Sequence, residues 1–294
     1  MRHLHRTFSE PEESRFDQEI ASPMQTQSIR RKSPEIKRPR RWYRPFVDLV
    51  YPRICVLCAK PIVELDLESL CDHCESQITP TTVSCLRCSA PLPVAGLGTS
   101  GATKKKCYYC ERRKWAFRKA YCYTAYSGAA ARAARKIKQP SCEPLAIELG
   151  KHVGLWLQTL EHFDAKQYDF VVPIPQHWIR RVIVRYNQAE VLAENVAREL
   201  EIPVRRNWLY RTRLTDKQGT KTIVERRTSV TDSFGCKLAG ELKSARILVV
   251  DDIVTSGATA HEAAASLRKS GASQVDIAAF ARGVGSFNRK IATH

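Results

Sequence analysis

The chain has 294 residues, enough for one large domain or two modest ones. With 43% hydrophobic and 27% charged residues it has the composition of a globular protein, and no apolar run is long enough to span a membrane. Residues 1–20 lack the apolar segment of a secretory signal, so we expect a cytoplasmic protein. The net charge of +18 favours polyanionic partners, meaning nucleic acid, phosphorylated metabolites or anionic lipid.

The N-terminal segment, residues 1–45, is polar and ends in the basic stretch RRKSPEIKRPRRWYRP. Such a composition buries too little apolar surface to fold alone, so we expect a disordered basic tail. It serves either as a solvated linker or as a contact for an anionic surface. A second, short tail is expected at residues 286–294.

Residues 46–115 contain four C-x-x-C pairs, which predict a module built on metal. Two thiolates separated by two residues can point at one ion, and two such pairs complete the tetrahedral Cys₄ site typical of structural zinc. We predict a double zinc ribbon with two structural zinc ions and pairs combined in sequence order, although an interleaved pairing is also compatible with the spacing. The two predicted sites are Cys55/Cys58 with Cys71/Cys74, and Cys85/Cys88 with Cys107/Cys110.

A redox function would normally use a single C-x-x-C pair, so four pairs favour zinc. So short a block has little core of its own, and metal binding would supply its folding free energy. We expect His73, between Cys71 and Cys74, to be a bystander. The remaining cysteines, Cys122, Cys142 and Cys236, are expected to be buried or inert thiols.

Residues 116–285 alternate between strand-like and helix-like patterns. Such an order predicts an α/β domain whose mainly parallel sheet is flanked by helices. The expected strands are 120–126, 168–175, 246–250 and 274–281, and the expected helices are 128–138, 143–160, 187–200 and one between the last two strands.

Residues 101–140 hold twelve lysines or arginines and one acid, with aromatic residues among them. Cations that track phosphates and rings that stack on bases suit single-stranded nucleic acid. The alternative is that the aromatics pack against the zinc knuckles while the cations are merely exposed. The aromatic residues that lie closest to these cations in the sequence include Tyr108, Tyr109, Trp115 and Phe117.

In the stretch ILVVDDIVTSGATA, Asp251 and Asp252 follow an apolar strand and precede a turn rich in hydroxyls. Phosphorelay receiver domains also open with such an acid pair, but they need several further βα units, and only about forty residues follow Asp252. Gly257 permits close backbone approach, and successive N–H groups at a helix start form an anion cradle. Thr259 and Glu262 have the spacing of a capping box, which would account for the helix start but not for the acids.

This stretch resembles the phosphoribosyl-pyrophosphate signature of type I phosphoribosyltransferases. The resemblance implies that Asp251 and Asp252 hold ribose hydroxyls, directly or through Mg²⁺, and that Mg²⁺ clamps the diphosphate. Many members of this family carry an acid, able to act as a base, at the position of Thr255. The residues implied in cradling the 5′-phosphate are Thr255, Ser256, Gly257, Ala258 and Thr259.

Residues 46–282 as a whole resemble the ComF family of double-zinc-ribbon, phosphoribosyltransferase-like proteins. The carriers are the cysteine knuckles, the PIP segment, YNQAEVLA from Tyr186 and the acid-pair signature. The family usually has Gly and Phe where Arg185 and Tyr186 stand. The resemblance implies a pyrophosphate-side loop containing Pro173 and a hood containing Arg226 and Arg227.

The combined interpretation is a phosphoribosyltransferase-like protein. It would bind phosphoribosyl pyrophosphate or a nucleotide 5′-phosphate and transfer 5-phosphoribose to or from a nitrogenous base. The ComF resemblance supports an alternative, a non-catalytic, single-stranded-DNA-binding component of the competence machinery for DNA uptake. A nucleotide-sensing regulator of the same fold is a third hypothesis. The acceptor base and the oligomeric state are not encoded in any recognisable motif.

Overall fold

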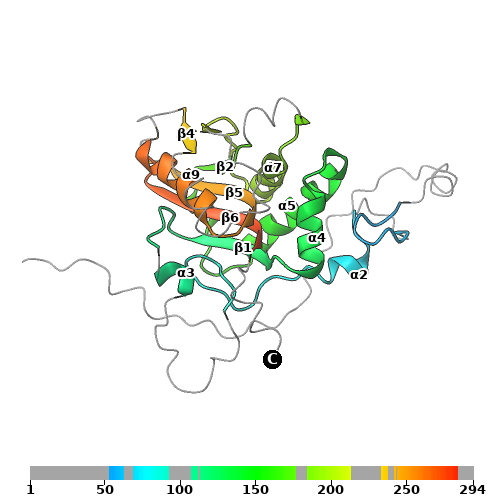
Figure 1. Cartoon of the computed structure of the whole chain (residues 1–294). Coiled ribbons are helices and arrows are strands. Elements are labelled where there is room, and N and C mark those ends of the chain that lie inside the picture. The colour runs from blue at the N-terminus through cyan, green and yellow to red at the C-terminus, as the bar shows by residue number, and fades with distance from the viewer. Residues whose placement is uncertain are drawn as a thin grey trace, which may run out of the picture. The chain divides into compact units, whose positions relative to one another are not determined.

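A parallel sheet of four strands forms the centre of the described structure, a computed structural model that describes residues 53–62, 69–92, 107–111, 113–176, 184–212, 233–237, 242 and 244–283. The strand order is β1-β6-β5-β2, and every neighbouring pair is parallel (Figure 1). The strands are β1 (Ala120–Ala125), β2 (Phe170–Pro173), β5 (Arg246–Val254) and β6 (Gln274–Arg282). In the described ranges we find no helix with the length and apolarity that a membrane crossing requires.

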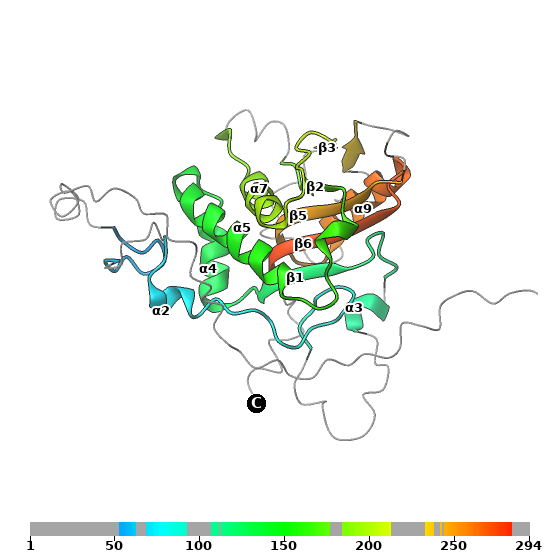
Figure 2. The ribbon, with the colours of Figure 1, turned by 180° about the vertical axis from the view of Figure 1, so that it is seen from behind.

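Helices cover both faces of this sheet, as expected for the α/β class. The packing follows strand alternation, because successive side chains of a strand point to opposite faces. Leu248 and Val250 of β5 join one core, and Ile247 and Val249 join the other. The first core receives α4 (Gly128–Lys136), α5 (Glu143–Gln158) and α7 (Gln188–Leu200), and the second receives α9 (Ala258–Lys269), an arrangement visible in Figures 1 and 2.

Helices α5 and α7 pack closely because α5 presents glycines to its neighbour. A Cβ added to Gly150 would lie 2.9 Å from the Leu192 carbonyl oxygen. One added to Gly154 would lie 2.7 Å from Cβ of Glu199. The missing side chains let the two helix backbones approach. Helix α7 contacts both α5 and β5, so its position is defined by its packing between them.

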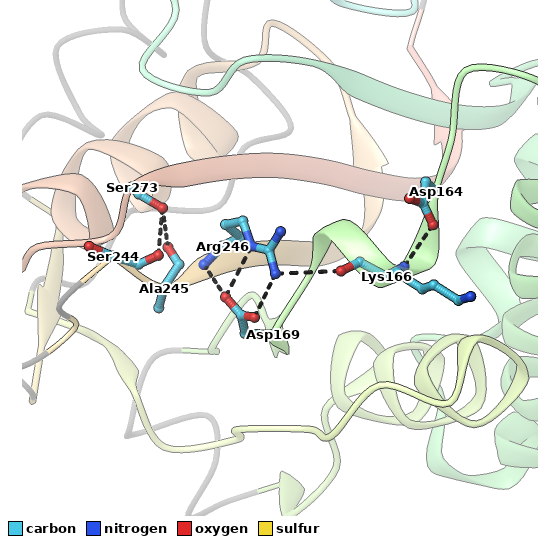
Figure 3. Close-up of polar contacts among 7 residues, drawn as sticks. All are labelled: Asp164, Lys166, Asp169, Ser244, Ala245, Arg246 and Ser273. Carbon is cyan, nitrogen blue, oxygen red and sulfur yellow. Dashed lines mark hydrogen bonds and ion pairs between the residues drawn. The ribbon is translucent and has the colours of Figure 1, made fainter.

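The N-terminal end of the sheet is fastened by polar contacts that have no part in a ligand site (Figure 3). Arg246, the first residue of β5, places Nη2 3.0 Å from Oδ1 of Asp169, which lies just before β2. Hydrogen bonding from Arg246 lowers the pKa of the Asp169 carboxyl. On the other side, Ser273 Oγ donates to the Ser244 carbonyl at 2.6 Å. The opposite, C-terminal end of the strands is where ligands bind in open parallel sheets.

The expected helices and strands are confirmed with small shifts at their ends, and one difference matters for the site. Strand β5 does not end before the acids but runs to Val254, because β6 pairs with it as far as Arg282. Asp251 and Asp252 are therefore strand residues. The remaining short elements are α2 (Asp72–Glu75), α3 (Tyr108–Glu111), η3 (Pro140–Cys142), η4 (Ala165–Gln167) and the antiparallel pair β3 (Leu209–Arg211) and β4 (Phe234–Cys236).

Candidate functional site

Two clusters of four cysteines form in the described part of the N-terminal module, and their pairing is the one predicted in sequence order. Within each cluster the four sulfur atoms lie within 4.8 Å of one another, close enough to ligate one ion. We call the set Cys55, Cys58, Cys71 and Cys74 the first cluster, and the set Cys85, Cys88, Cys107 and Cys110 the second cluster.

The two clusters repeat one local design. Each begins with a knuckle closed by a backbone hydrogen bond of 2.8 Å, from Ala59 to the Cys55 carbonyl or from Ser89 to the Cys85 carbonyl. Ala59 and Ser89 both have a positive φ, 58° and 54°. A short helix, α2 or α3, then follows the third cysteine. The cysteine block is thus two copies of one small unit.

The chemistry of the sulfurs in the second cluster suits a cation. Hydrogen bonding with Cys107 lowers the pKa of the Cys85 thiol, and hydrogen bonding with Cys110 lowers that of Cys107 to about 6. Hydrogen bonding with Cys107 raises the pKa of Cys88 and of Cys110. Two of the four sulfurs are thus favoured as thiolates, the form that zinc binds. His73 contacts Gln77 and belongs to neither cluster, as expected.

The acid pair lies near the C-terminal end of β5 and is almost completely buried, with Asp251 8% and Asp252 7% exposed. Burial is the main cause that raises the pKa of Asp251 well above its ordinary value, and the negative charge of Asp252 adds to it. Arg211, on β3, opposes this shift through its positive charge. The Nε of Arg211 donates to the carbonyl oxygen of Pro175 at 3.0 Å, so this cation lies just beyond the end of β2.

Asp252 has different neighbours from Asp251. Its Oδ2 accepts from Nε2 of Gln188, the first residue of α7, at 3.1 Å. The ammonium of Lys138, which follows α4, lies 3.5 Å from the same oxygen. Gln188 is itself held by Nε2 of Gln176 at 2.7 Å. Asp252 is therefore positioned by two elements that are distant from it in sequence.

A small pocket connects the acid pair to the turn that follows it. Gly257 has φ 75° and is the residue from which α9 starts, so the turn requires a residue that tolerates the left-handed region. The N–H groups at the start of a helix favour an anion. The lining residues are Asp251, Ile253, Val254, Thr255, Gly257, Thr259 and Ala260.

The predicted capping box at Thr259 and Glu262 is wrong. Helix α9 starts two residues earlier than such a box would give, at Ala258, with Gly257 as its N-cap. The cause is the left-handed Gly257, which turns the chain into the helix without help from the Thr259 hydroxyl. Thr259 is consequently inside the first turn and lines the pocket.

Of the predicted ligand residues, four line this pocket, namely Asp251, Thr255, Gly257 and Thr259. Ser256 Oγ accepts from the Ala258 N–H at 3.4 Å within the turn. Pro173 is buried and pairs in register with Val250, directly beside the acids. Arg226 and Arg227 lie outside the described residues.

Three of the four aromatic side chains singled out in the basic segment are described by the structure, and these three are packed inward. Trp115 and Phe117 are buried and stacked, with ring centroids 5.1 Å apart. Tyr109 is half-buried and lies against the Arg282 guanidinium. Packing on the zinc module, the alternative to a base-stacking role, holds for these three rings.

The two departures from the ComF pattern have clear structural settings. Arg185 adopts φ 49°, a conformation in which the glycine usual in that family has no steric penalty. The extra hydroxyl of Tyr186 donates to the carbonyl of Ile137 at 2.9 Å, one residue before Lys138. Tyr186 thus supports the segment that carries a cation to Asp252.

Three residues of the site were missed in the sequence: Lys138, Gln188 and Arg211. Lys138 was noted only as part of a basic helix, and Arg211 falls on a short strand with no distinctive pattern. Gln188 lies within the YNQAEVLA motif, which is the one signal that could have singled it out. All three reach the acids through tertiary contacts.

Comparison with known protein families defines the class. A double zinc ribbon domain model matches residues 46–112, and a phosphoribosyl transferase domain model matches residues 187–290. The chain therefore joins a double zinc ribbon to a domain of the type I phosphoribosyltransferase fold. This is the combination of the ComF family, and the resemblance to that family is confirmed.

Two similar curated proteins are a competence protein and a DNA utilization protein. Competence protein F of Haemophilus influenzae is 30% identical over 113 residues, which is 38% of this chain. That match spans only about half of the relative, 49% of its length. DNA utilization protein YhgH of Escherichia coli O157:H7 is 23% identical over 234 residues, which cover 78% of this chain and 96% of that protein.

Two solved structures illustrate the similarity found among known structures. Glutamine phosphoribosylpyrophosphate amidotransferase from B. subtilis, complexed with ADP and GMP, is 19% identical with a TM-score of 0.31, over 45% of this chain and 26% of that one. Purine phosphoribosyltransferase from Pyrococcus horikoshii is 16% identical with a TM-score of 0.29, over 46% and 70%.

Proposed function

We propose that this protein binds phosphoribosyl pyrophosphate, or the 5′-phosphate of a nucleotide, and transfers 5-phosphoribose to or from a nitrogenous base. One observation carries the proposal: a single pocket is lined by Asp251 of the buried acid pair and by Thr255, Gly257 and Thr259 of the turn. A ribose phosphate has hydroxyls at one end and an anion at the other. The pocket offers the carboxylate of Asp251 as an acceptor for the ribose hydroxyls and the turn as a cradle for the phosphate.

In this proposal the 5′-phosphate accepts hydrogen bonds from the backbone of the turn and from the hydroxyls of Thr255 and Thr259. Helix α9, of 12 residues, adds the positive end of its dipole. Asp251 and Asp252 accept hydrogen bonds from the ribose hydroxyls. Lys138 and Arg211 place cations beside the acids, where they offset the charge of a diphosphate.

The transfer consists of one bond formed and one broken. A nitrogen of the base attacks C1 of the ribose, the bond from C1 to the diphosphate oxygen breaks, and diphosphate leaves with the electron pair. The nitrogen then loses its proton. With threonine at position 255, catalysis rests on positioning and electrostatics rather than on a carboxylate base there.

The acid pair also fits magnesium, because adjacent carboxylate oxygens are ligands of hard cations. Asp251 and Asp252 would hold the ion together with the ligand's diphosphate, where it would neutralise charge on the leaving group. Two structural zinc ions would be resident in the first and second clusters. We further propose 46–115 as the zinc module, 116–285 as the phosphoribosyltransferase-like domain, and residues 1–45 and 286–294 as tails.

The test is a thermal shift with phosphoribosyl pyrophosphate and Mg²⁺. The ligand is expected to raise the Tm of the wild type, and Asp251→Asn combined with Asp252→Asn is expected to abolish the shift. Glu161→Gln, the same chemical change at an exposed position, serves as the control. Absence of a shift in the wild type would refute ligand binding. If the shift is present, an assay of pyrophosphate release with candidate bases separates phosphoribosyl transfer from binding alone.

A second candidate function, binding of single-stranded DNA in competence-type DNA uptake, is favoured by one surface. Arg132, Arg135 and Lys136 are all exposed on α4, and the exposed Lys138 continues this row to Asp252. We call these four residues the α4 basic row. A polyanion could follow it toward the pocket.

Binding of single-stranded DNA through the α4 basic row should weaken steeply with salt and survive the two aspartate substitutions. Combining Arg132→Ser with Arg135→Ser is expected to reduce the salt slope, whereas Arg268→Ser on α9 is not. Binding that is insensitive to salt would exclude this function. A nucleotide-sensing regulator, the third candidate, would show the thermal shift without any pyrophosphate release.

A further inference from the structure

Arg282, the last residue of β6, is an arginine buried to 1% exposure. In the described part of the chain its guanidinium meets backbone carbonyls and one aromatic ring, and no carboxylate is within ion-pair distance of it. Nε donates to Cys88 at 3.0 Å, and Nη1 donates to Val254 at 2.8 Å, to Gly283 at 3.0 Å and to Thr255. Burying a cation without a counter-ion is costly, so these contacts must hold the guanidinium tightly.

The first group of contacts belongs to the second cluster. Cys88 is one of its cysteines. Tyr109 lies between Cys107 and Cys110, and its ring centroid is 4.9 Å from the guanidinium carbon of Arg282. Arg282 therefore touches both knuckles of the second cluster.

The other contacts are made at the turn that follows β5. We call residues 255–259 the phosphate turn, because the proposed function places the 5′-phosphate of the ligand there. Because a peptide unit is planar and trans, a carbonyl and the N–H that follows it point in opposite directions. Arg282 attracts the carbonyls of Val254 and Thr255, so the N–H groups of Thr255 and Ser256 point away from the cation. An anion cradle requires N–H groups oriented in this way.

The residues that follow the second cluster in the chain contact the other end of the phosphate turn. A Cβ added to Gly257 would lie 2.9 Å from two ring atoms of Trp115, so the indole lies directly on that residue. The next residue, Ala116, donates its N–H to Nδ1 of His261 in α9 at 2.9 Å. Trp115 follows the second cluster by five residues after Cys110, so both ends of the turn are held by this part of the chain.

The first cluster has a different set of neighbours. The N–H of Ser69 donates to Oε2 of Glu148 at 2.8 Å, and Glu75 Oε1 lies 3.5 Å from Nε2 of His152. Both partners are on α5. None of the contacts described for the first cluster involves the phosphate turn, which makes it an internal reference.

We propose that Arg282 is a positioning residue that couples zinc at the second cluster to anion binding at the phosphate turn, so that the two zinc ions are functionally different. The inference rests on the proposed function, because it concerns the ligand of the same turn. Such coupling is reciprocal. A bound ligand slows the release of zinc from the second cluster, and loss of that zinc ion lowers the affinity for the ligand. Release of zinc from the first cluster does not depend on the ligand.

The experiment follows zinc release from the full-length protein into a chromogenic chelator, with and without ribose 5-phosphate. This probe occupies the turn and the acid pair but lacks a diphosphate that would itself chelate zinc. In the wild type we expect release of one of the two ions to slow by about fivefold or more, with the other unchanged. The dissociation constant of ribose 5-phosphate is measured on the same samples by calorimetry.

Arg282→Lys keeps the charge but cannot bond four carbonyls at once. It should bind ribose 5-phosphate more weakly and lose the ligand-dependent retention of zinc. Arg246→Lys, the same change at the opposite end of the sheet, should retain both. If Arg282→Lys does not fold, Trp115→Phe provides the same test at the other end of the turn.

The outcomes are distinct. Binding to the wild type with equal slowing of both zinc ions, or of neither, overturns the coupling while leaving the proposed function intact. Unchanged retention in both Arg282→Lys and Trp115→Phe overturns it as well. Failure of ribose 5-phosphate and of phosphoribosyl pyrophosphate to bind the wild type refutes the proposed function, and the coupling with it.

Discussion

At the scale of single residues, the charged form of the Asp251 carboxyl, which the proposed ligand and Mg²⁺ require, lowers the stability of the folded protein. Burial, followed by the charge of Asp252, raises its pKa. The native state therefore binds a proton more tightly than the unfolded chain does, and it holds more protons above the ordinary carboxyl pKa of about 4. The free energy of unfolding then decreases as pH rises from that value through the raised pKa.

Asp251→Asn should consequently stabilise the ligand-free protein at pH 7, because the amide has no charge to bury. We expect a gain of about 1 kcal/mol, or roughly 2–4 °C in Tm, together with loss of the ligand-induced shift. Thermal unfolding measured from pH 4 to pH 8 checks this. The variant should gain on the wild type as pH rises, and an advantage that shrinks toward pH 8 would contradict the explanation.

Arg185 offers a second prediction at this scale. It is exposed and holds φ 49°, which costs an L-residue about 1 kcal/mol. Arg185→Gly should relieve that strain, although greater freedom of the unfolded chain offsets part of it. We expect a gain of up to about 1 kcal/mol in urea unfolding. Arg185→Ala, which removes the same side chain without relieving the backbone, should show no gain.

At the scale of elements, the contact of α5 with α7 decides where Gln188 meets Asp252. Gly150 leaves no room for a side chain, since its added Cβ would lie 2.9 Å from the Leu192 carbonyl oxygen. A larger residue must push the helices apart, and overpacking of this kind costs about 1–3 kcal/mol. Because α7 begins with Gln188, the displacement would also disturb the acid pair.

Gly150→Val is therefore expected to lower the free energy of unfolding by about 2 kcal/mol and to weaken phosphoribosyl-pyrophosphate binding. Lys151→Val, on the exposed side of the same helix, controls for a β-branched side chain in α5 that meets no neighbouring helix. Urea unfolding and calorimetric titration provide the two measurements. Because valine has a higher helix propensity than glycine, unchanged stability of Gly150→Val would contradict the close contact of the helices.

At the scale of the whole described structure, the zinc module is part of both cores. Cys55, Cys74 and Ile78 belong to the core that contains α5, and Cys88 and Trp115 belong to the one that contains α9. Each face of the sheet thus has zinc ligands in its packing. The predicted boundary between residues 115 and 116 separates two sequence patterns, whereas the packing continues across it, with Trp115 stacked on Phe117.

Removal of zinc should therefore destabilise the phosphoribosyltransferase-like domain as well as the ribbons. We expect a strong chelator to lower the Tm of a single unfolding transition followed by circular dichroism, and residues 116–294 expressed alone to be less stable than the full chain. Chelator already loaded with zinc serves as the control. Two transitions, of which the later is unaffected by chelation, would contradict this expectation.

The local signals in the sequence were sufficient for the class of fold, the elements, the four C-x-x-C pairs and the acid pair with its turn, whereas the choice between sequence-order and interleaved cysteine pairing needed the structure. Periodicity and short spacings act within a few residues, so they are readable along the chain. The capping box was misjudged because Thr259 and a left-handed Gly257 both suit a helix start, and only the backbone decides between them.

What surrounds the acids and the turn was decided by tertiary structure alone. Gln188 meets Asp252 across 64 residues, and Arg282 meets Cys88 across 194. No sequence pattern relates positions so far apart, because their contact depends on the order of strands in the sheet and on the packing of helices against it. The sequence thus predicted the acid pair with its turn and the two sets of four cysteines, and the fold alone placed Arg282 between the second cluster and that turn.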